Sequence, residues 1–555
     1  MKNRITYFFF IGFLGLLISC GTSKSQKHLP DVSQYNSAKP VVTKLSDSVF
    51  ISGKNSLLKN QQGLWELYAE GDPLEIGLNT GALSDSLLKK QQKIFFSKIT
   101  DLVPSKFQQK MLRHFLKWFN RKLYSNVPEE YQTEIYGVSQ YTSHEFDNFA
   151  PQYQRGLYLH AAHDIGHALQ DLALVGCSSF AAWGDKTEDG NLILGRNFDF
   201  YVSDAFAENK IIAFINPKEG HQFMMVTWPG MIGAVSGMNI EGLTVTINAS
   251  KSKIPLIAKT PISILTREIL QHAKNLEEAI AIAKNRKVFV SESIMVGSAH
   301  DNKAILIEVS PNKMDVFEVP NNDQLICSNH FQGEAFADDK RNLKQIDESH
   351  SEYRFERMQE LLSENQKINP EIASEILRNK DGLKNIPLGY GNEKALNQLL
   401  AHHGIIFKPK EKLVWVSANP FQLGEFVCYN LDSVFKERKS PIAFSLEEKK
   451  LNIAKDPFVT SVAFKNYKKF KIENAKIDLY LENKENISAE FLQNYQSLNP
   501  DYWVVYYKTG LYFYQKKECQ LAKSNFEKAL SKEITTTPDK IKIEKYLKKL
   551  KRKLK

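Results

Sequence analysis

One cysteine of the 555-residue chain stands where it could serve as a nucleophile. Cys177 follows Gly176 and opens an apolar run, and the segment Gly195-Arg-Asn-Phe-Asp199 comes after an intervening turn signal. Two antiparallel strands joined by that turn would bring Arg196 and Asp199 back beside Cys177. A cationic neighbour lowers the pKa of a thiol and favours the nucleophilic thiolate. The pattern therefore predicts a cysteine nucleophile tuned by an arginine.

The segments on the two sides of this cysteine differ in pattern. Residues 74–174 place apolar side chains three and four positions apart, which predicts helices. After Gly176, short β-rich runs alternate with turn signals, and a helix is predicted over Ile262–Lys284. Two further helices are expected, over Glu352–Leu362 and Glu371–Leu377. The expected strands are Cys177–Trp183, Leu192–Phe200, Ile211–Ile215, Phe223–Trp228, Ile232–Val235, Leu243–Ile247, Ile294–Ser298, Ala304–Val309, Gly404–Phe407, Leu413–Val416 and Phe426–Tyr429. This order predicts an α+β sandwich with helices packed outside the sheets and a core over residues 177–435.

Further landmarks follow the cysteine hairpin along the chain. They are Gly237-Met-Asn-Ile-Glu-Gly-Leu243 continuing to Asn248, Cys327-Ser-Asn329-His-Phe331, Ser351-Glu-Tyr-Arg354-Phe-Glu-Arg357, and Asn419-Pro420 with Leu423-Gly-Glu-Phe426. In this order, over residues 150–435, they resemble the N-terminal-nucleophile (Ntn) hydrolases, and most of all the acyl-coenzyme A:6-aminopenicillanate acyltransferase branch (peptidase family C45). Choloylglycine (bile-salt) hydrolase, penicillin V acylase and acid ceramidase are its wider kin. The resemblance implies a four-layer αββα sandwich.

The same resemblance implies a self-activating enzyme. The Cys177 thiol would attack the carbonyl of Gly176, an N→S acyl shift would follow, and hydrolysis would free Cys177 as a new N-terminus. Gly176 suits this step because a residue without Cβ tolerates strained backbone conformations. The freed α-amine, with a reference pKa of about 7.7–8.0, could then act as base for its own thiol. The light chain, residues 20–176, would stay packed on the core.

The resemblance also implies a role for each remaining residue of the site. Asp199 would orient the α-amine, and Asn248 would be the side-chain member of the oxyanion hole, where losing one donor typically costs ~3 kcal/mol. Asn329 would hold the surroundings of the nucleophile. Arg354 would anchor the network, with Arg357 close enough in register to remain an alternative. Read without the resemblance, the two asparagines would be turn or loop residues and Arg354 an exposed helix charge.

Three histidines lie at helical spacing shortly before the predicted cut: His160, His163 and His167. Such spacing presents imidazoles together, as a metal site would need. Ntn chemistry needs no metal, however, and the order His-Glu-x-x-His does not occur here. We therefore expect a structural or maturation role for these histidines, and neither a metal nor a cofactor in the site.

The N-terminus has the pattern of an export signal. Basic residues at Lys2 and Arg4 precede an apolar run over residues 5–18, which is too short to span a bilayer but suits a signal-peptide core. The run ends in Leu17-Ile-Ser-Cys20-Gly21, which resembles a bacterial lipobox with Cys20 as the lipidated first residue of the mature protein. This implies a signal peptide over 1–19, a tether over 20–45 and, since Gly21 follows the cysteine, an outer-membrane location. An ordinary secretory signal with an incidental cysteine is the alternative.

The C-terminal residues 436–555 form a separate helical unit. One stretch of it resembles a tetratricopeptide repeat, a hairpin in which small residues let two helices approach, and a plain helical hairpin fits equally well. The residues with this spacing are Gly510, Ala522, Phe526 and Ala529. Residues 540–555 predict a basic amphipathic helix, exposed to solvent or in contact with anionic lipid.

Composition and charge bound the function class. The chain is 42% hydrophobic and 25% charged, as globular proteins are, and its formal net charge is +10. That excess lies at the two ends, in Lys2 and Arg4 and in the nine Lys and Arg residues against one Glu over residues 540–555. The body between them is neutral, which argues against a nucleic-acid partner. Five cysteines in so long a chain do not make a disulfide framework.

The sequence thus predicts a lipid-anchored, self-cleaving amidohydrolase that acts on N-acyl small molecules. An acyltransferase with an amine acceptor is one alternative, and a non-catalytic binding protein that recruits a partner through the helical tail is another. The joint presence of Cys177, Arg196, Asp199 and Asn248 argues against the latter. The acyl chain, the leaving amine, the membrane face and the oligomeric state stay open, although the resemblance allows a homo-oligomer. In domain terms, residues 46–176 are expected to be a helical pro-segment.

Overall fold

The structure is a computed structural model that describes residues 21–169, 176–200, 203–252, 257–320, 322–400, 402–436 and 444–554. Its strands are β1 Thr43–Ser46, β2 Val49–Ser52, β3 Asn55–Lys59, β4 Trp65–Gly71, β5 Ser178–Ala182, β6 Ile193–Phe198, β7 Ile211–Pro217, β8 Phe223–Thr227, β9 Ser236–Asn239, β10 Leu243–Ala249, β11 Glu292–Ser298, β12 Lys303–Val309, β13 Met314–Phe317, β14 Gln324–Cys327, β15 His403–Lys408, β16 Leu413–Ser417 and β17 Phe426–Asn430. Its α-helices are α2 Pro73–Leu83, α3 Asp85–Leu102, α4 Lys106–Phe119, α5 Glu129–Ser139, α6 Gln152–Leu169, α7 Asp204–Glu208, α8 Ile262–His272, α9 Leu276–Lys284, α10 Lys340–Glu348, α11 Ser351–Glu364, α12 Pro370–Leu377, α13 Leu431–Lys436, α14 Val462–Asn483, α15 Ala489–Leu498, α16 Trp503–Gln515, α17 Cys519–Leu530 and α18 Thr537–Lys553.

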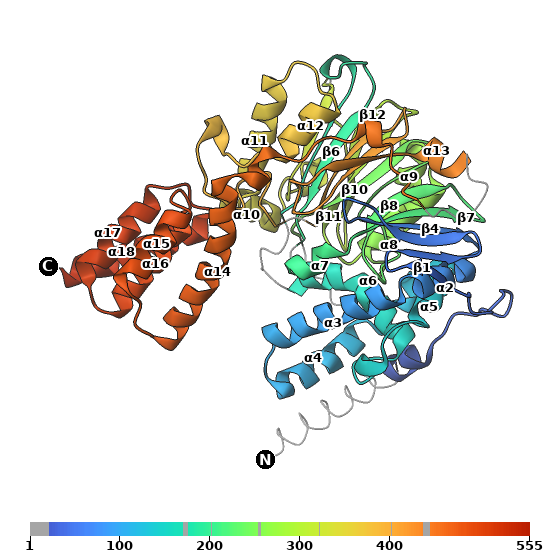
Figure 1. The fold of residues 1–555 in the computed structure, drawn as a ribbon, viewed down its shortest axis with the longest axis horizontal. Coiled ribbons are helices and arrows are strands. Elements are labelled where there is room, and N and C mark those ends of the chain that lie inside the picture. Colours follow the sequence, from blue (N-terminus) through green and yellow to red (C-terminus); the bar gives the residue numbers. More distant parts are fainter. Residues whose placement is uncertain are drawn as a thin grey trace.

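Two β-sheets form the centre of the molecule (Figure 1). The larger has eleven strands in the order β1-β2-β3-β4-β7-β8-β9-β10-β11-β12-β13, and the smaller has six in the order β14-β5-β6-β15-β16-β17. Neighbouring strands run antiparallel except for β4 and β7, which are parallel. The predicted α+β class is confirmed.

The apolar core has a part between the sheets and a part outside each of them. Between the sheets, Met224 and Leu306 of the larger sheet share one cluster with Ile405 of the smaller sheet. Helices α2, α8 and α9 cover the outer side of the larger sheet, and α11 and α12 cover the outer side of the smaller one (Figure 1). The assignment of these layers to the Ntn-hydrolase sandwich stays a prediction.

The segment before Cys177 differs from the helical pro-segment expected over residues 46–176. Residues 43–71 form the strands β1 to β4, and β4 pairs in parallel with β7 along its whole length, from Trp65 opposite Ile211 onward. Gly53 and Gly63, with φ of +56° and +85°, close the turns between these strands in a conformation that favours glycine. Within residues 46–176, the first helix begins at Pro73. Because β4 continues the sheet of the core, this part of the segment belongs to the core itself.

The tether expected over residues 20–45 is packed against the helices in its first part. Residues 21–27 are helical, and the Gln26 Nε2 donates to the Tyr158 hydroxyl at 2.6 Å. The His28 ring stacks on Tyr124 with centroids 4.1 Å apart and bonds to the Gln132 Oε1 at 3.0 Å. The polar composition of this stretch suggested a free linker, but its polar side chains find partners on the helices.

The strand predicted at Ile232–Val235 is wrong, because side chains bind the backbone groups that a strand would use. The Ile232 N–H donates to the His160 Nε2 at 2.9 Å, and the Ile232 carbonyl accepts from the Arg267 Nη1 at 2.8 Å. The Val235 carbonyl accepts from the Arg196 Nη1 at 3.2 Å. The loop therefore satisfies its polar groups without a partner strand.

The helix predicted over Ile262–Lys284 is two helices, α8 and α9. The Asn239 Nδ2 caps the first by donating to the carbonyls of Leu270 and Ala273 at 2.9 and 2.7 Å. The Asn275 side chain starts the second by accepting the Glu278 N–H at 2.9 Å. A cap from a distant residue and a cap from a neighbouring one therefore divide an apolar pattern that predicted a single helix.

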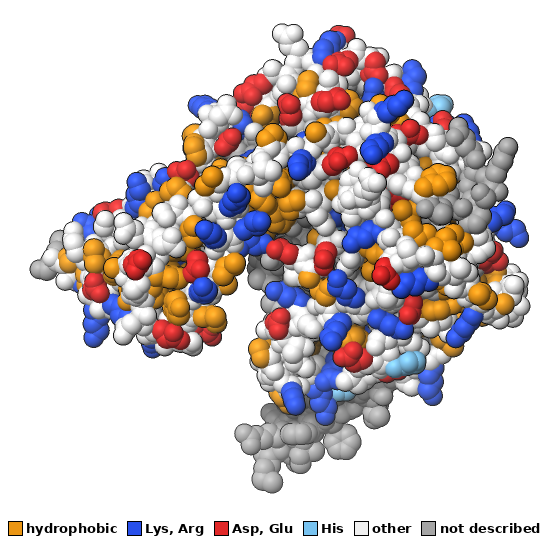
Figure 2. Space-filling view, viewed as in Figure 1, with side chains coloured by type: hydrophobic (Ala, Val, Ile, Leu, Met, Phe, Trp, Pro, Cys, Tyr) orange, Lys and Arg blue, Asp and Glu red, His pale blue; other side chains and the backbone are white. Residues whose placement is uncertain are grey.

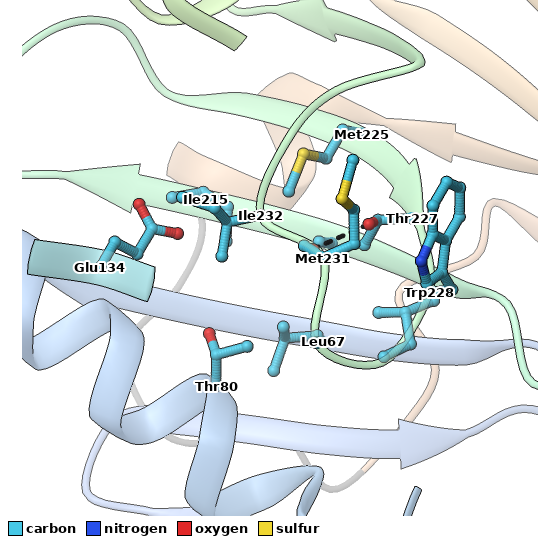
Figure 3. Close-up of a pocket in the computed structure, with 12 residues that line it drawn as sticks. Leu67, Thr80, Glu134, Ile215, Met225, Thr227, Trp228, Met231 and Ile232 are labelled. Carbon is cyan, nitrogen blue, oxygen red and sulfur yellow. Dashed lines mark hydrogen bonds between the residues drawn. The ribbon is translucent and has the colours of Figure 1, made fainter. Parts of the chain in front are cut away.

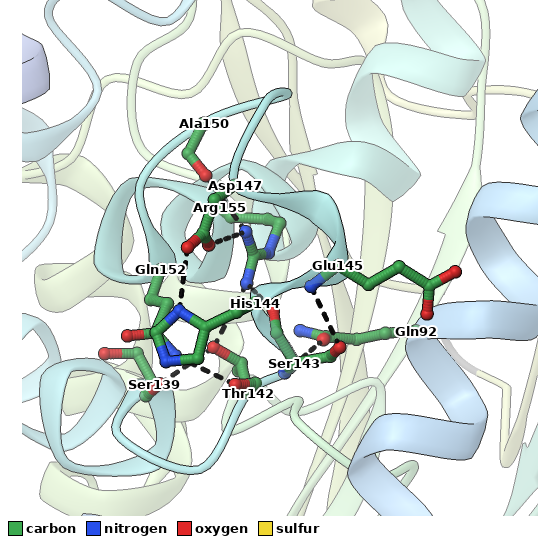
Figure 4. Close-up of polar contacts among 10 residues, drawn as sticks. All are labelled: Gln92, Ser139, Thr142, Ser143, His144, Glu145, Asp147, Ala150, Gln152 and Arg155. Atoms are coloured by element: carbon green, nitrogen blue, oxygen red, sulfur yellow. Dashed lines mark hydrogen bonds and ion pairs between the residues drawn. The ribbon is translucent and has the colours of Figure 1, made fainter.

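The turn that leads into α6 is organised by one buried arginine (Figure 4). Arg155 donates to the Asp147 carboxylate at 2.9 Å and to the carbonyls of Ala150 and Ser143 at 3.0 and 2.5 Å. These bonds satisfy the carbonyls of Ser143 and Ala150, which lie outside the helices in the connection between α5 and α6. Arg155 therefore fixes how the last helix before Cys177 is oriented.

The C-terminal helices α14 to α18 have an apolar core of their own and project beside the two-sheet body (Figure 1). An ideal Cβ on Gly510 of α16 would lie 2.8 Å from the ring of Phe526 on α17, so the predicted close approach of two helices is confirmed. The predicted basic helix is α18, where Lys545, Lys548 and Lys549 are exposed. Over the body, basic and acidic side chains are interspersed on the face that Figure 2 shows.

Candidate active site

The strands β5 and β6 bring the predicted nucleophile and its arginine together. They pair antiparallel, with Ser178 opposite Asn197 and Ser179 opposite Arg196. The Arg196 Nη2 lies 3.6 Å from the Cys177 Sγ, and both side chains are buried. The predicted juxtaposition is therefore present at the buried start of β5.

Arg196 is fixed by groups of the larger sheet. Its Nη1 donates to the Ser236 hydroxyl at 2.6 Å, and its Nη2 donates to the Ile247 carbonyl. Behind it, Ser236 bonds to the His403 Nε2 at 2.9 Å, and the Nδ1 atoms of His403 and His402 lie 3.0 Å apart. This buried histidine pair was not predicted, although two adjacent histidines just before a predicted strand were a signal for it.

The thiol of Cys177 is neutral in the uncut chain. Burial raises the pKa of Cys177 to about 11, and Arg196 offsets only part of that effect. The thiolate expected from a cationic neighbour is thus not favoured here. Moving the anion out of water costs more free energy than its attraction to the Arg196 guanidinium contributes.

Asp199 follows β6 and is fully buried. Its Oδ1 accepts from the Gln422 Nε2 at 3.1 Å, and its Oδ2 has no hydrogen-bond partner among the described residues. Burial raises the pKa of Asp199 to about 7, against the lowering influence of Arg354, Gln422 and Arg196. The carboxyl is thus set to change protonation near neutral pH. A carboxyl with this pKa can bind or release a proton near neutral pH.

Arg354 connects the nucleophile to the helix layer over the smaller sheet. From α11 its Nη1 donates to the Cys177 carbonyl at 2.5 Å and to the Ser178 hydroxyl at 2.7 Å. Its Nη2 donates to the Asn329 Oδ1 at 2.5 Å, and the Asn329 Nδ2 donates to the Ala249 carbonyl at 2.8 Å. Arg354 and Asn329, which the sequence marked in two separate motifs, are thus bonded to each other beside Cys177.

Arg357, the alternative to Arg354, is also buried but points elsewhere. Its Nη1 donates to Glu360 at 2.5 Å, and its other nitrogens donate to the side chains of Asn379 and Asn385 at 3.2 and 2.6 Å. These contacts tie α11 to the segment after α12. The geometry therefore selects Arg354 as the arginine next to Cys177.

Asn248 lies at the facing side of the larger sheet, with its donors engaged. Its Nδ2 donates to the carbonyls of Cys327 and Ser328 at 3.1 and 3.2 Å, and its Oδ1 accepts from the Ser179 hydroxyl at 2.7 Å. The amide thus joins β10, β5 and the end of β14. An oxyanion role would require this amide to exchange a backbone carbonyl for substrate.

Gly176 is enclosed by groups that the sequence analysis did not single out. Its carbonyl accepts from the Gln398 Nε2 at 2.9 Å, and its N–H donates to the Asp199 carbonyl at 3.2 Å. Gln398 and Gln422 carry no recognisable signal, because a glutamine in a loop is usually a solvated residue. Only the folded chain brings Gln398 to Gly176 and Gln422 to Asp199.

A buried carboxyl, Glu292, is a further residue that the sequence did not single out. It opens β11, and neither of its oxygens has a hydrogen-bond partner among the described residues. Burial raises its pKa well above the usual range, with Asp164 acting in the same direction and Arg196 against it. Burial thus favours the neutral form of the Glu292 carboxyl beside Arg196.

The first of the three helical histidines has a structural position. The His160 Nδ1 donates to the Gly156 carbonyl at 2.8 Å, and its Nε2 accepts the Ile232 N–H. Burial lowers the pKa of His160 to about 4, so the ring is neutral. The side chains of His163 and His167 lie outside the described part of the chain. Within the described residues, no group of three or more His, Cys, Asp or Glu side chains could hold a metal.

A small apolar pocket lies between the helices before Cys177 and the larger sheet (Figure 3). Its lining residues are Leu67, Thr80, Glu134, Ile211, Ala213, Ile215, Met225, Thr227, Trp228, Gly230, Met231 and Ile232. The Trp228 ring stacks on Phe200, with centroids 6.0 Å apart, and meets His402 edge-on at 5.6 Å. The pocket thus ends at an aromatic cluster that continues to the residue after Asp199.

The described residues settle two further points. The four cysteines among them, Cys177, Cys327, Cys428 and Cys519, are free thiols. None of the described helices is long and apolar enough to cross a membrane. The predicted signal peptide and Cys20 lie outside the described residues.

This fold and site define an α+β protein with a buried Cys-Arg-Asp centre at the start of a sheet strand. Residues 186–420 match the model of the family described as acyl-coenzyme A:6-aminopenicillanic acid acyl-transferase. The matched stretch contains Arg196, Asp199, Asn248 and Arg354 and begins after Cys177. This part of the chain is therefore similar to that family in the region of the site.

Two curated proteins resemble the chain over part of their length. An uncharacterized protein of Archaeoglobus fulgidus is 25% identical over 277 residues, which are 46% of this chain and 45% of that protein. Protein dcd1B of Dictyostelium discoideum is 25% identical over 278 residues, 47% of this chain and 52% of that protein. The chain thus spans about half the length of the curated relatives it matches.

Solved structures also resemble this chain. A Caenorhabditis elegans ortholog of N-acylethanolamine-hydrolyzing acid amidase is 17% identical with a TM-score of 0.31, covering 42% of this chain and 93% of that one. A mutant of the conjugated bile acid hydrolase from Clostridium perfringens is 13% identical with a TM-score of 0.32, covering 47% of this chain and 93% of that one.

Proposed function

We propose that this protein is an N-terminal-cysteine amidohydrolase that cuts its own chain between Gly176 and Cys177 and then cleaves linear amide bonds of N-acyl compounds. The observation that carries this proposal is the buried contact between the Cys177 Sγ and Arg196 at 3.6 Å, on a cysteine preceded by glycine. Arg354 on the Cys177 carbonyl and Asp199 nearby complete a set of groups that a merely structural cysteine would not need.

The residues divide the work of turnover as follows. The free α-amine of Cys177 takes the thiol proton, Arg196 stabilises the thiolate, and Asp199 orients the ammonium that results. The sulfur attacks the substrate carbonyl, Asn248 donates to the developing oxyanion, and the amine product leaves with the proton. Water then attacks the thioester and releases the acid.

The fragment before the cut would stay bound after cleavage. The ladder between β4 and β7 spans seven residues on each strand. The buried ion pair between Glu134 of α5 and Arg267 of α8, at 3.0 Å, adds a charge contact that would be costly to break. In each of these contacts the two partners lie on opposite sides of the Gly176–Cys177 bond in sequence, so both contacts support a two-chain mature enzyme.

Hydrolysis is favoured over acyl transfer, because water is always present at the site whereas an acceptor amine must bind. The similarity to an acyl-transferase family keeps transfer to an amine as the second candidate.

Self-cleavage is tested with the chain from residue 21 and its Cys177→Ala variant. We expect the first to yield fragments that end at Gly176 and begin at Cys177, and the variant to stay whole, since it lacks the attacking sulfur. Intact masses and N-terminal sequencing read out both. A whole chain in both samples, from a folded protein, would rule the mechanism out and favour a non-catalytic binding protein.

We further propose that Cys20 carries lipid and anchors the protein to the outer membrane. The lipobox-like Leu17-Ile-Ser-Cys20 supports this, because acyl chains stabilise an anchor by about 0.8 kcal/mol per buried methylene. The full chain expressed in a bacterium should incorporate an alkyne-tagged fatty acid and sediment with membranes. The Cys20→Ala variant should do neither. Equal labelling of both would refute the anchor.

A further inference from the structure

The carbonyl that the proposed self-cleavage must attack already holds a buried amide donor. The Gln398 Nε2 donates to the Gly176 oxygen at 2.9 Å, and the Gln398 side chain is 2% exposed. In a water-excluded site, a donor aimed at a carbonyl oxygen stabilises the negative charge that grows there during attack. The contact is made in the uncut chain, where this carbonyl is the substrate.

Gly176 is shaped around this contact. An ideal Cβ at residue 176 would lie 2.3 Å from the Gln398 Nε2 and 2.8 Å from its Oε1. Real Cβ atoms do not approach other atoms so closely, so any other residue would displace the amide. The glycine therefore serves the donor as well as the conformational freedom of the backbone.

The segment that carries Gln398 is held from two sides. On the core side, the Asn197 Nδ2 donates to the Leu396 carbonyl at 2.9 Å. On the other side, Leu399 is buried in the core of the C-terminal helices and adopts φ of +54°, a conformation that a leucine keeps only when packing holds it. The Asn499 side chain adds two bonds to the backbone of Tyr390, at 3.0 and 2.8 Å. The C-terminal extension thus helps to hold the donor in place.

We propose that Gln398 is a catalytic residue of self-cleavage, the oxyanion donor for the Gly176 carbonyl; this rests on the proposed function. The Cys177 sulfur bonds to the Gly176 carbon, and the carbonyl oxygen takes the electron pair while Gln398 donates to it. The C–N bond then breaks, and the thiol proton ends on the Cys177 nitrogen. Water hydrolyses the thioester, which leaves a carboxylate on Gly176 and regenerates the thiol. Turnover of substrate uses Asn248 in place of Gln398.

The test follows cleavage of newly made full chain in a pulse and chase, with gel separation and N-terminal sequencing of the fragments. Gln398→Leu should slow cleavage by about 10²–10³-fold, the typical effect of losing one oxyanion donor. Gln398→Glu donates only while protonated, so its cleavage should speed up as the pH falls, unlike that of the wild type. Gln154→Leu is the matched control, because this buried glutamine donates to the carbonyls of His28 and Ser25 far from the site.

The outcomes separate this inference from the proposed function. If the wild type cuts at Gly176–Cys177 and a folded Gln398→Leu cuts equally fast, the role of Gln398 is refuted and the enzyme proposal stands. If the wild type never cuts there, both fall. Should Gln398→Leu fail to fold, the acid-dependent rate of Gln398→Glu decides, since a purely structural glutamine would give no such pH profile.

Discussion

Arg354→Ala is expected to stop self-cleavage and to destabilise the protein. The change leaves the Cys177 carbonyl, the Ser178 hydroxyl and the Asn329 amide oxygen without their buried donor. Breaking such a buried charged network typically costs about 3–5 kcal/mol. It also removes the positive charge that lowers the pKa of Asp199 most, so that pKa would rise further. Urea unfolding of a Cys177→Ala background measures the stability, and pulse-chase in the native background measures cleavage.

The matched control is Arg357→Ala. This arginine is as deeply buried and lies on the same helix, but it bonds to Glu360, Asn379 and Asn385. We expect it to lower stability to a similar degree while the remaining folded protein still cuts its chain. Arg354→Lys, which keeps the charge but not the fork of donors, should retain partial cleavage. Equal loss of cleavage in both alanine variants would show that stability, not position, decides.

Asp199→Asn is expected to abolish turnover and yet to stabilise the uncut chain at alkaline pH. Burial raises the pKa of Asp199 to about 7 from 3.8, so the folded state binds this proton more tightly than the unfolded state does. The stability that this proton contributes is full below about pH 4 and is lost as the pH rises through 7. Between pH 5 and pH 8 this loss is on the order of 3 kcal/mol, and the neutral asparagine avoids it.

Urea unfolding of Cys177→Ala and Cys177→Ala/Asp199→Asn at pH 5 and pH 8 measures this effect. The single variant should lose stability between the two pH values, and the double variant should lose distinctly less. Glu308, whose pKa burial also raises to about 7, titrates in both proteins and leaves a common slope. A double variant that is no more stable at pH 8 would show that Arg354 and Arg196 keep Asp199 charged in the fold.

Much of the fold could be predicted from the sequence, at elements where the apolar pattern matches the face that the folded chain buries. The strands β7, β8, β10 and β12 and the helices α11 and α12 carry apolar patterns that suit their buried faces, and their predicted positions hold. The predictions failed where a distant side chain decided. Asn239 of strand β9 caps the end of α8. The side chains of Arg196, Arg267 and His160 bond to the backbone of residues 232–235, which therefore does not pair as a strand.

The sequence by itself determined the hairpin of Cys177, Arg196 and Asp199, because strand alternation and one turn are local properties that bring these residues together. It also marked Asn248, Asn329 and Arg354, whose types suit the chemistry. Only the tertiary structure separated Arg354 from Arg357 and brought Gln398 to Gly176 and Gln422 to Asp199. It also decided the protonation of Cys177 and Asp199, because their pKa values depend on burial, and burial arises only when distant segments pack around a site.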